Sequence, residues 1–164
     1  MPVLANDVSV LLRGLGWRVR YVPHRVIEDY NACYRVVYRG RVIAPPAADR
    51  LGIPLNEIWL SEELRGFEKY VLFHELREIV YRYQGHGVDE AHLLARVDEA
   101  LVFCGDQRWI EYFMRFPDST APLRCLQELC NAIDQGTGGK EVLYRILVEC
   151  VDRRVPRHGP GTQV

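Results

Sequence analysis

The chain has 164 residues, of which 48% are hydrophobic, and a net charge of −1, which is the balance of a globular protein that buries its own core. The near-zero charge, with arginines scattered among acids, argues against a nucleic-acid or anionic-membrane binder. No run approaches the roughly 20 apolar residues that span a bilayer, and the first residues lack the basic and apolar regions of a signal peptide. These features predict a cytoplasmic protein.

The five cysteines predict reduced thiols that pack mostly in the core. Their number is odd, they form no C-x-x-C pair, and the five-residue spacing of Cys125 and Cys130 is poor for zinc. Lysine occurs only as Lys69 and Lys140, and the other basic residues are arginines. A GC-rich genome or a thermophilic source would explain this composition, and in a thermophile an internal disulfide would be less surprising.

The first 60 residues predict a small, mainly antiparallel sheet. A short helix is expected over residues 7–15, and one helical turn over residues 47–51. Two β-rich runs on either side of Arg39-Gly40 predict a hairpin, and Pro23 ends the strand that precedes it. The strand candidates are residues 17–22, 34–38, 41–44 and 58–60.

Two long helices follow, joined by the tight turn of residues 85–87. Ser61 is a suitable cap for the first helix, whose regular part is expected to begin near Phe67 and to end at the turn. Asp89 is the expected cap of the second helix, over residues 90–103. The shortness of the turn predicts that the two helices pack side by side and antiparallel.

Histidines and carboxylates alternate along these two helices. His74 and Glu78 are four residues apart, so their side chains are neighbours on one helix face, with Glu75 to one side. Glu78 lies seven residues before Gly85 and His92 lies seven after it, so antiparallel packing brings Glu78 and His92 level. The sequence therefore predicts a cluster of His74, Glu78 and His92.

Two imidazoles and a carboxylate are the donor set of a catalytic zinc site, with water in the open fourth position. Zinc would lower the pKa of that water, and Glu75 would take its proton as general base. Tyr81 or Tyr70 would stabilise the oxyanion. His86 is the fallback third ligand, although helix rise places it roughly 12 Å from Glu78 along the axis. The same donors also accept iron, manganese or nickel.

Over about residues 55–100 the chain resembles the zincin metallopeptidases, whose active-site helix reads His-Glu-x-x-His. The matching residues here are His74-Glu75-Leu76-Arg77-Glu78, so a glutamate replaces the second histidine. In thermolysin-like members the helix supplies two histidines and a later helix a glutamate, whereas here the later helix would supply His92. The strand candidate of residues 57–60 before the helix is also similar to small zincins. The resemblance implies a zinc-dependent hydrolase that acts on peptides, with Trp59 or its neighbours lining the substrate cleft beside an edge strand.

Two other interpretations explain the same residues. The pattern also arises by chance on charged helices, and then His74, Glu78 and Arg82 would form a solvated face with a Glu78–Arg82 ion pair. Alternatively, the chain would be a non-catalytic interaction or regulatory protein that binds a partner through the charged faces of the two helices. A metal enzyme requires the cluster at ligand distances beside a concave pocket, whereas a binding module requires a flat patch.

The last 60 residues predict helices over residues 107–116, 120–135 and 141–151. Trp109, Phe113 and Met114 suit either the core or the surface of a homodimer.

Residues 153–164, with three arginines and a histidine among prolines and glycines, predict a flexible basic tail after a single domain of residues 1–152. The expected architecture is α+β: a small, mainly antiparallel N-terminal sheet packed on a mostly helical core with a central antiparallel helix pair.

Overall fold

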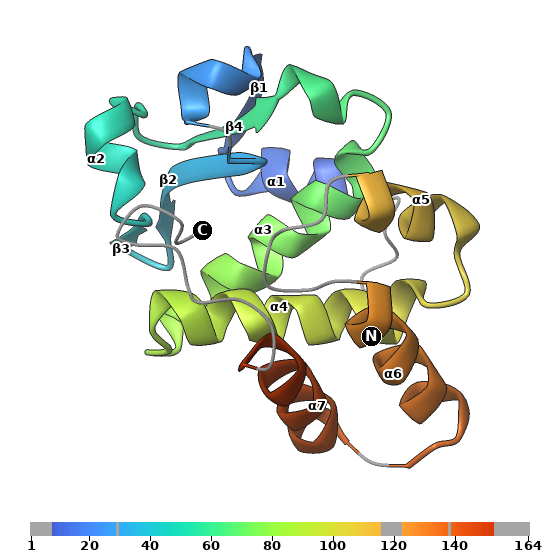
Figure 1. The fold of residues 1–164 in the computed structure, drawn as a ribbon. Coiled ribbons are helices and arrows are strands. Elements are labelled where there is room, and N and C mark those ends of the chain that lie inside the picture. Colours follow the sequence, from blue (N-terminus) through green and yellow to red (C-terminus); the bar gives the residue numbers. More distant parts are fainter. Residues whose placement is uncertain (1–7, 29, 116–122, 138, 153–164) are drawn as a thin grey trace.

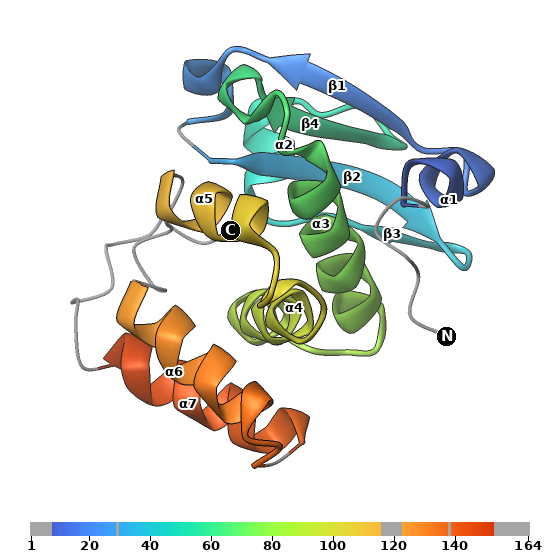
Figure 2. The ribbon, with the colours of Figure 1, turned by 90° about the vertical axis from the view of Figure 1, so that its right-hand side faces the viewer.

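The computed structural model of the protein describes residues 8–28, 30–115, 123–137 and 139–152. It has an α+β fold, as predicted, in which a four-stranded sheet lies against a helical core (Figure 1). The sheet covers one side of helix α3, and helix α4 lies along its other side (Figure 2). The helices are α1 (Val8–Gly14), α2 (Ala47–Leu51), α3 (Glu68–Tyr83), α4 (Val88–Phe103), α5 (Gln107–Arg115), α6 (Leu123–Asp134) and α7 (Lys140–Asp152), with 3-10 turns η2 (His24–Ile27) and η3 (Glu62–Leu64).

The sheet has the strand order β1-β4-β2-β3. Strand β2 pairs antiparallel with both β3 and β4, which confirms the predicted hairpin. Strands β1 and β4 run parallel, because the chain between them makes the crossover that a parallel pair requires. The sheet is therefore mixed, although two of its pairings are antiparallel. The strands are β1 (Arg18–Val22), β2 (Ala32–Tyr38), β3 (Arg41–Ile43) and β4 (Glu57–Ser61).

Alternation along β2 sends its side chains to two different clusters. Tyr34 and Val36 join the main core with residues of α3, whereas Cys33 joins a smaller cluster with Ala47 and Ala48 of α2. Helices α3 and α2 therefore cover opposite faces of the sheet. The central helix α3 lies between the sheet and α4, so it is buried on most of its sides.

The two long helices begin and end close to the predicted positions, but their caps differ. Ser61 accepts a hydrogen bond from the backbone N–H of Glu63, so it caps η3 instead of the long helix. Gly66 then takes a left-handed conformation (φ 89°), and α3 starts after Phe67, as expected. Helix α4 begins at Val88 with Gly87 at its N-cap, so the predicted cap at Asp89 is wrong, and Asp89 lies in the first turn.

The C-terminal helices pack against α4 and α3. Trp109 and Phe113 of α5 are buried in the main core, whereas Met114 is 48% exposed. Helices α6 and α7 form an antiparallel pair that contacts α4 (Figure 2). Thr120, the predicted cap of α6, and the predicted tail of residues 153–164 lie outside the described residues. Within the described chain, no helix has both the length and the apolar composition that a membrane crossing requires.

Two disulfides join the C-terminal helices, which corrects the prediction of reduced cysteines. Cys104 at the end of α4 is bonded to Cys130 of α6, and Cys125 of α6 is bonded to Cys150 of α7. Cys33 keeps a buried free thiol. The sequence spacings of 26 and 25 residues carry no sign of this pairing, which depends on how α6 packs against both α4 and α7.

Candidate metal centre

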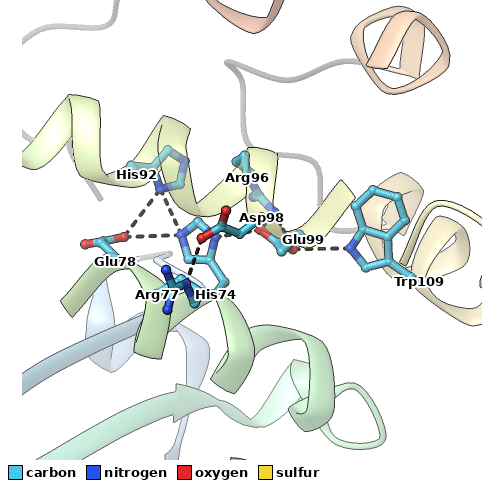
Figure 3. A network of polar contacts seen from close by, with 8 residues as sticks. All are labelled: His74, Arg77, Glu78, His92, Arg96, Asp98, Glu99 and Trp109. Atoms are coloured by element: carbon cyan, nitrogen blue, oxygen red, sulfur yellow. Dashed lines mark hydrogen bonds and ion pairs between the residues drawn. The ribbon is translucent and has the colours of Figure 1, made fainter. Parts of the chain in front are cut away.

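The three predicted ligands meet between α3 and α4 (Figure 3). His74 and Glu78 lie one turn apart on α3, and His92 faces them from α4. The Nε2 atom of His74 lies 3.2 Å from Oε2 of Glu78 and 3.1 Å from Nδ1 of His92. The third distance, from Nδ1 of His92 to Oε2 of Glu78, is 3.6 Å. The approach of His92 to Glu78 that the sequence predicts is therefore present.

The spacing of these three atoms suits a tetrahedral zinc ion. Zinc binds nitrogen and oxygen ligands at about 2.0–2.2 Å, and tetrahedral angles then separate the ligand atoms by roughly 3.3–3.6 Å. The observed edges of 3.1, 3.2 and 3.6 Å lie at or close to this range without any rearrangement. Two histidines and a glutamate are also the donor types that zinc prefers in catalytic sites.

The cluster is buried, which contradicts the interpretation of the two helices as solvated charged surfaces. The exposed fractions are 3% for His74, 1% for Glu78 and 9% for His92. Arg96 and Glu99, which share a stripe on α4 with His92, are also buried. Side chains in this position cannot offer a charged face to a protein partner.

A tyrosine from the sheet orients the carboxylate of Glu78. The hydroxyl of Tyr34 on β2 donates a hydrogen bond of 2.9 Å to Oε1 of Glu78. The other carboxylate oxygen, Oε2, is the atom that faces both histidines. Because Tyr34 occupies Oε1, Oε2 is the oxygen left to bind a metal. Residues around metal sites commonly orient the ligands by hydrogen bonds of this kind.

A second carboxylate orients His74 from the far side of its ring. Oε2 of Glu99 lies 2.6 Å from Nδ1 of His74, and an N–H at Nδ1 donates to it. Glu99 also accepts hydrogen bonds from Arg96, at 3.2 Å to each oxygen, and from the indole N–H of Trp109, at 3.2 Å. With the proton at Nδ1, the lone pair at Nε2 points into the cluster, as a metal ligand requires.

The buried carboxylates make the centre a strong site for positive charge. Burial alone would lower the pKa of His74, but the charge of Glu99 and the hydrogen bonds with Glu78 and Glu99 raise it to about 10. Burial would raise the pKa of Glu78, but hydrogen bonds from His74 and His92 hold it well below its usual range. Burial opposes ionisation of Glu99 as well, yet the positive charges of Arg96 and His74 lower its pKa. A bound cation would take the place of the proton that these groups share.

Glu75 lies beside the cluster and interacts with it through charge. It is 2% exposed, and no hydrogen bond joins its carboxylate to another residue within the described chain. It lines a narrow pocket together with Glu78. Burial, and next the charge of Glu78, raise the pKa of Glu75 to about 8. A carboxylate held in this way is available to a water molecule or a substrate.

The structure places the other predicted site residues elsewhere. His86 pairs with the carboxylate of Glu90 in the same turn and is not part of the three-residue group. The hydroxyl of Tyr81 donates to Asp98 at 2.8 Å and accepts from Lys140 at 3.1 Å, so the predicted oxyanion role of Tyr81 finds no support in this geometry. Asp98 also accepts from Arg77, and this network runs alongside the cluster (Figure 3).

The remaining candidates face other partners. The hydroxyl of Tyr70 donates to Asp106 at 2.8 Å. Trp59 is half-buried beside the α2 cluster, on the sheet face opposite α3, and donates its indole N–H to Glu57. Cys33 does line the pocket, but burial and the neighbouring charge of Glu75 raise the pKa of its thiol to about 12, which disfavours it as a thiolate ligand.

Four residues that support the cluster were not assigned a role from sequence. Glu99 and Arg96 lie on the same helical stripe as His92, and this stripe was the signal that could have identified them. Tyr34 and Trp109 come from separate elements, and their spacing from His74 in the sequence carries no such signal. In comparisons with protein families, with curated proteins and with solved structures, nothing matches this chain.

Proposed function

We propose that this protein is a zinc-dependent hydrolase of the zincin type, with His74, Glu78 and His92 as the metal ligands. The observation that carries the proposal is the triangle of ligand atoms, with edges of 3.1, 3.2 and 3.6 Å, between two adjacent helices. Its donor set and its spacing both suit zinc.

Support from outer residues distinguishes this cluster from a chance meeting of polar side chains. Glu99 sets the tautomer of His74, and Tyr34 selects the free oxygen of Glu78. Glu99 is itself held by hydrogen bonds from Arg96 and Trp109. Proteins build such carboxylate–histidine pairs around metal ligands, because they fix both ring orientation and basicity.

The number of ligands favours catalysis over a structural metal. Among the described residues, the group contains three protein ligands, and structural zinc sites usually have four. A zinc ion with an open position acidifies a bound water and polarises a carbonyl group. Glu75 would accept the proton of the attacking water and pass it to the leaving group, because its carboxylate is adjacent and forms no hydrogen bond with another of the described residues. The expected reaction is hydrolysis of an amide or ester, with peptides as the class that the zincin resemblance suggests.

The experiment compares zinc-loaded wild type with Glu75→Gln on a panel of small amide, ester and peptide substrates. Glu75→Gln should bind zinc normally and lose about 10²–10⁴-fold in kcat, the usual contribution of a general base. Glu62→Gln changes an exposed glutamate in the same way and should keep full activity. Turnover that survives in Glu75→Gln would contradict the role given to Glu75.

We also propose the cytoplasm as the compartment. Two disulfides are compatible with it in an organism, such as a hyperthermophile, whose intracellular proteins keep such bonds. Alkylation of free thiols in intact cells, followed by mass spectrometry of the purified protein, tests whether the two disulfides are present in the cytoplasm. Four alkylated cysteines besides Cys33 in the cytoplasmic protein would contradict the bonded state there.

A further inference from the structure

The C-terminal helices α6 and α7 form a unit that rests on one helix of the body. They pack against each other, and outside this pair the element that they contact most is α4. Figure 2 shows both helices on the side of α4 that lies away from the sheet. We call this unit the α6–α7 pair. Its attachment to the rest of the molecule therefore depends on a limited set of contacts.

The two disulfides differ in what they join and in how deeply they are buried. Cys125–Cys150 joins α6 to α7 within the pair, and its two residues are 0% and 3% exposed. Cys104–Cys130 joins the end of α4 to α6, and both of its residues are half-buried. Among the described residues, it is the covalent bond that ties the α6–α7 pair to α4. Because disulfide exchange requires access to sulfur, a reductant in solution reaches this bond more easily than the buried one.

One charged contact adds to the attachment, but it contributes little. Nζ of Lys140, the first residue of α7, lies 3.0 Å from Oδ1 of Asp98 on α4. The side chain of Lys140 is 52% exposed, so solvent screens this ion pair. When Lys140 moves away, Asp98 still accepts hydrogen bonds from Arg77 and Tyr81. Release of the pair at this point therefore leaves no buried charge without a partner.

Apolar burial supplies the rest of the attachment. Leu126 and Leu129 of α6, and Leu143 and Leu147 of α7, belong to the main core and are each 3% exposed or less. This burial keeps the α6–α7 pair docked in the oxidised protein. Contacts of this kind also open and close locally while the remaining structure stays folded. The bond between Cys104 and Cys130 limits that opening, because it restricts the chain in the open state.

We propose that Cys104–Cys130 is a redox-sensitive switch, which a dithiol reductant opens in the folded protein to free the α6–α7 pair from α4. A thiolate of the dithiol attacks one sulfur of the bond and forms a mixed disulfide. The second thiol of the reductant then displaces the protein sulfur and closes an internal disulfide in the reductant. Two electrons and two protons pass to the protein, which gains two thiols. Cys125–Cys150 stays intact, so the freed pair remains one unit. The switch does not depend on a bound metal.

Graded reduction of the native protein tests which bond opens first. The full chain is incubated with increasing dithiothreitol, free thiols are blocked with N-ethylmaleimide, and the blocked cysteines are identified by mass spectrometry of peptides. Cys104 and Cys130 should become blocked at dithiothreitol concentrations at least about tenfold lower than Cys125 and Cys150, because access controls the exchange. Reduction of both bonds together, or of Cys125–Cys150 first, would contradict the switch.

Hydrogen exchange then shows whether the α6–α7 pair is released. When Cys104–Cys130 alone is reduced, the backbone amides of α6 and α7 should exchange at least about tenfold faster, a conservative share of the effect of closing a 26-residue loop. The amides of the sheet and of α3 should keep their rates. Removal of the reductant and addition of oxidised glutathione should restore slow exchange. Exchange in α6 and α7 that does not change on this reduction would show that the bond does not control docking.

A double variant reproduces the open switch without a reductant. Cys104→Ala/Cys130→Ala should show fast exchange in α6 and α7 from the start, with no further change at low dithiothreitol. Cys33→Ser keeps both disulfides and should respond as the wild type does. Exchange in the double variant that is as slow as in the oxidised wild type would overturn the proposal. The two measurements on the wild-type protein decide the matter even if the double variant does not fold.

Discussion

Nδ1 of His74 on α3 lies 2.6 Å from Oε2 of Glu99 on α4, so a ligand-bearing helix and its neighbour are joined by a hydrogen bond that has no solvent around it. This contact directs the other ring nitrogen of His74 towards Glu78 and His92. The candidate metal centre therefore depends on the packing of the two helices as much as on the three ligands.

Replacing this second carboxylate should weaken metal binding without removing a ligand. Glu99→Gln keeps the size of the side chain but loses the charge that holds the Nδ1 proton of His74, and zinc affinity should fall about 10–100-fold. Competition with a chromophoric chelator measures this change. Glu111→Gln, at an exposed glutamate of α5, is the matched control. Equal zinc affinity in Glu99→Gln and wild type would show that Glu99 has no part in the site.

Tyr34 is expected to act through Glu78. Tyr34→Phe removes the hydrogen bond to Oε1, so the carboxylate can rotate, and zinc affinity should fall about tenfold, the lower end of effects seen for outer-shell residues. The metal-free protein should also lose about 1–3 kcal/mol in denaturant unfolding, because a buried carboxylate loses a donor. Tyr38→Phe is the control, since Tyr38 uses its ring to pack on Trp17 and Tyr83. A loss of stability with unchanged zinc affinity would make Tyr34 a purely structural residue.

Asp106 should give helix α5 a stability that depends on pH. It accepts hydrogen bonds from the backbone N–H of Arg108 at 2.9 Å and from the hydroxyl of Tyr70 at 2.8 Å. Burial would raise the pKa of Asp106, but these bonds lower it below its ordinary value of 3.8. A carboxyl whose pKa falls on folding stabilises the protein above its unfolded pKa, and the contribution disappears as pH falls through the folded pKa.

Asp106→Ala should therefore cost about 0.5–2 kcal/mol at neutral pH, the usual value of a helix N-cap. The difference from wild type should shrink below pH 3.8 in acid-range unfolding experiments. Asp134→Ala, at an exposed acid near the end of α6, should show neither effect. A difference that stays constant into acid would mean that the charge of Asp106 is not what stabilises the helix.

The two disulfides should leave one reactive thiol. Protein denatured without reductant should show about one thiol per chain, from Cys33, and five after reduction. Closed loops of 26 and 25 residues are each expected to contribute about 3 kcal/mol to stability, so reduction should lower the melting temperature markedly. Cys33→Ser should show the same fall in melting temperature on reduction. Five free thiols before reduction would contradict both bonds.

The sequence was informative wherever local spacing determines geometry. The four-residue spacing of His74 and Glu78, and their distance from a short turn, were sufficient to predict the approach of His92. The hairpin of β2 and β3 followed from β-rich runs on either side of Arg39-Gly40. In each case the interacting residues are joined by a few residues of regular structure.

Contacts between distant elements could not be predicted in this way. Tyr34 reaches Glu78 across 44 residues, and its role depends on which face of β2 meets α3. The parallel pairing of β1 with β4 and the pairing of Cys104 with Cys130 depend on packing in the same manner. The burial of Glu78 could not be predicted either, because Glu78 lies among charged residues of α3 and only the packing of α4 and the sheet covers it.

Metal content is the most direct test of the central claim that His74, Glu78 and His92 form a metal site. The protein is purified without chelator or metal-affinity tag, incubated with zinc, dialysed and measured by elemental analysis, alongside His74→Ala, His92→Ala and His86→Ala. We predict about one zinc per chain in the wild type and in His86→Ala, and none in the other two variants. No zinc in the wild type, or equal zinc in all four proteins, would contradict the site.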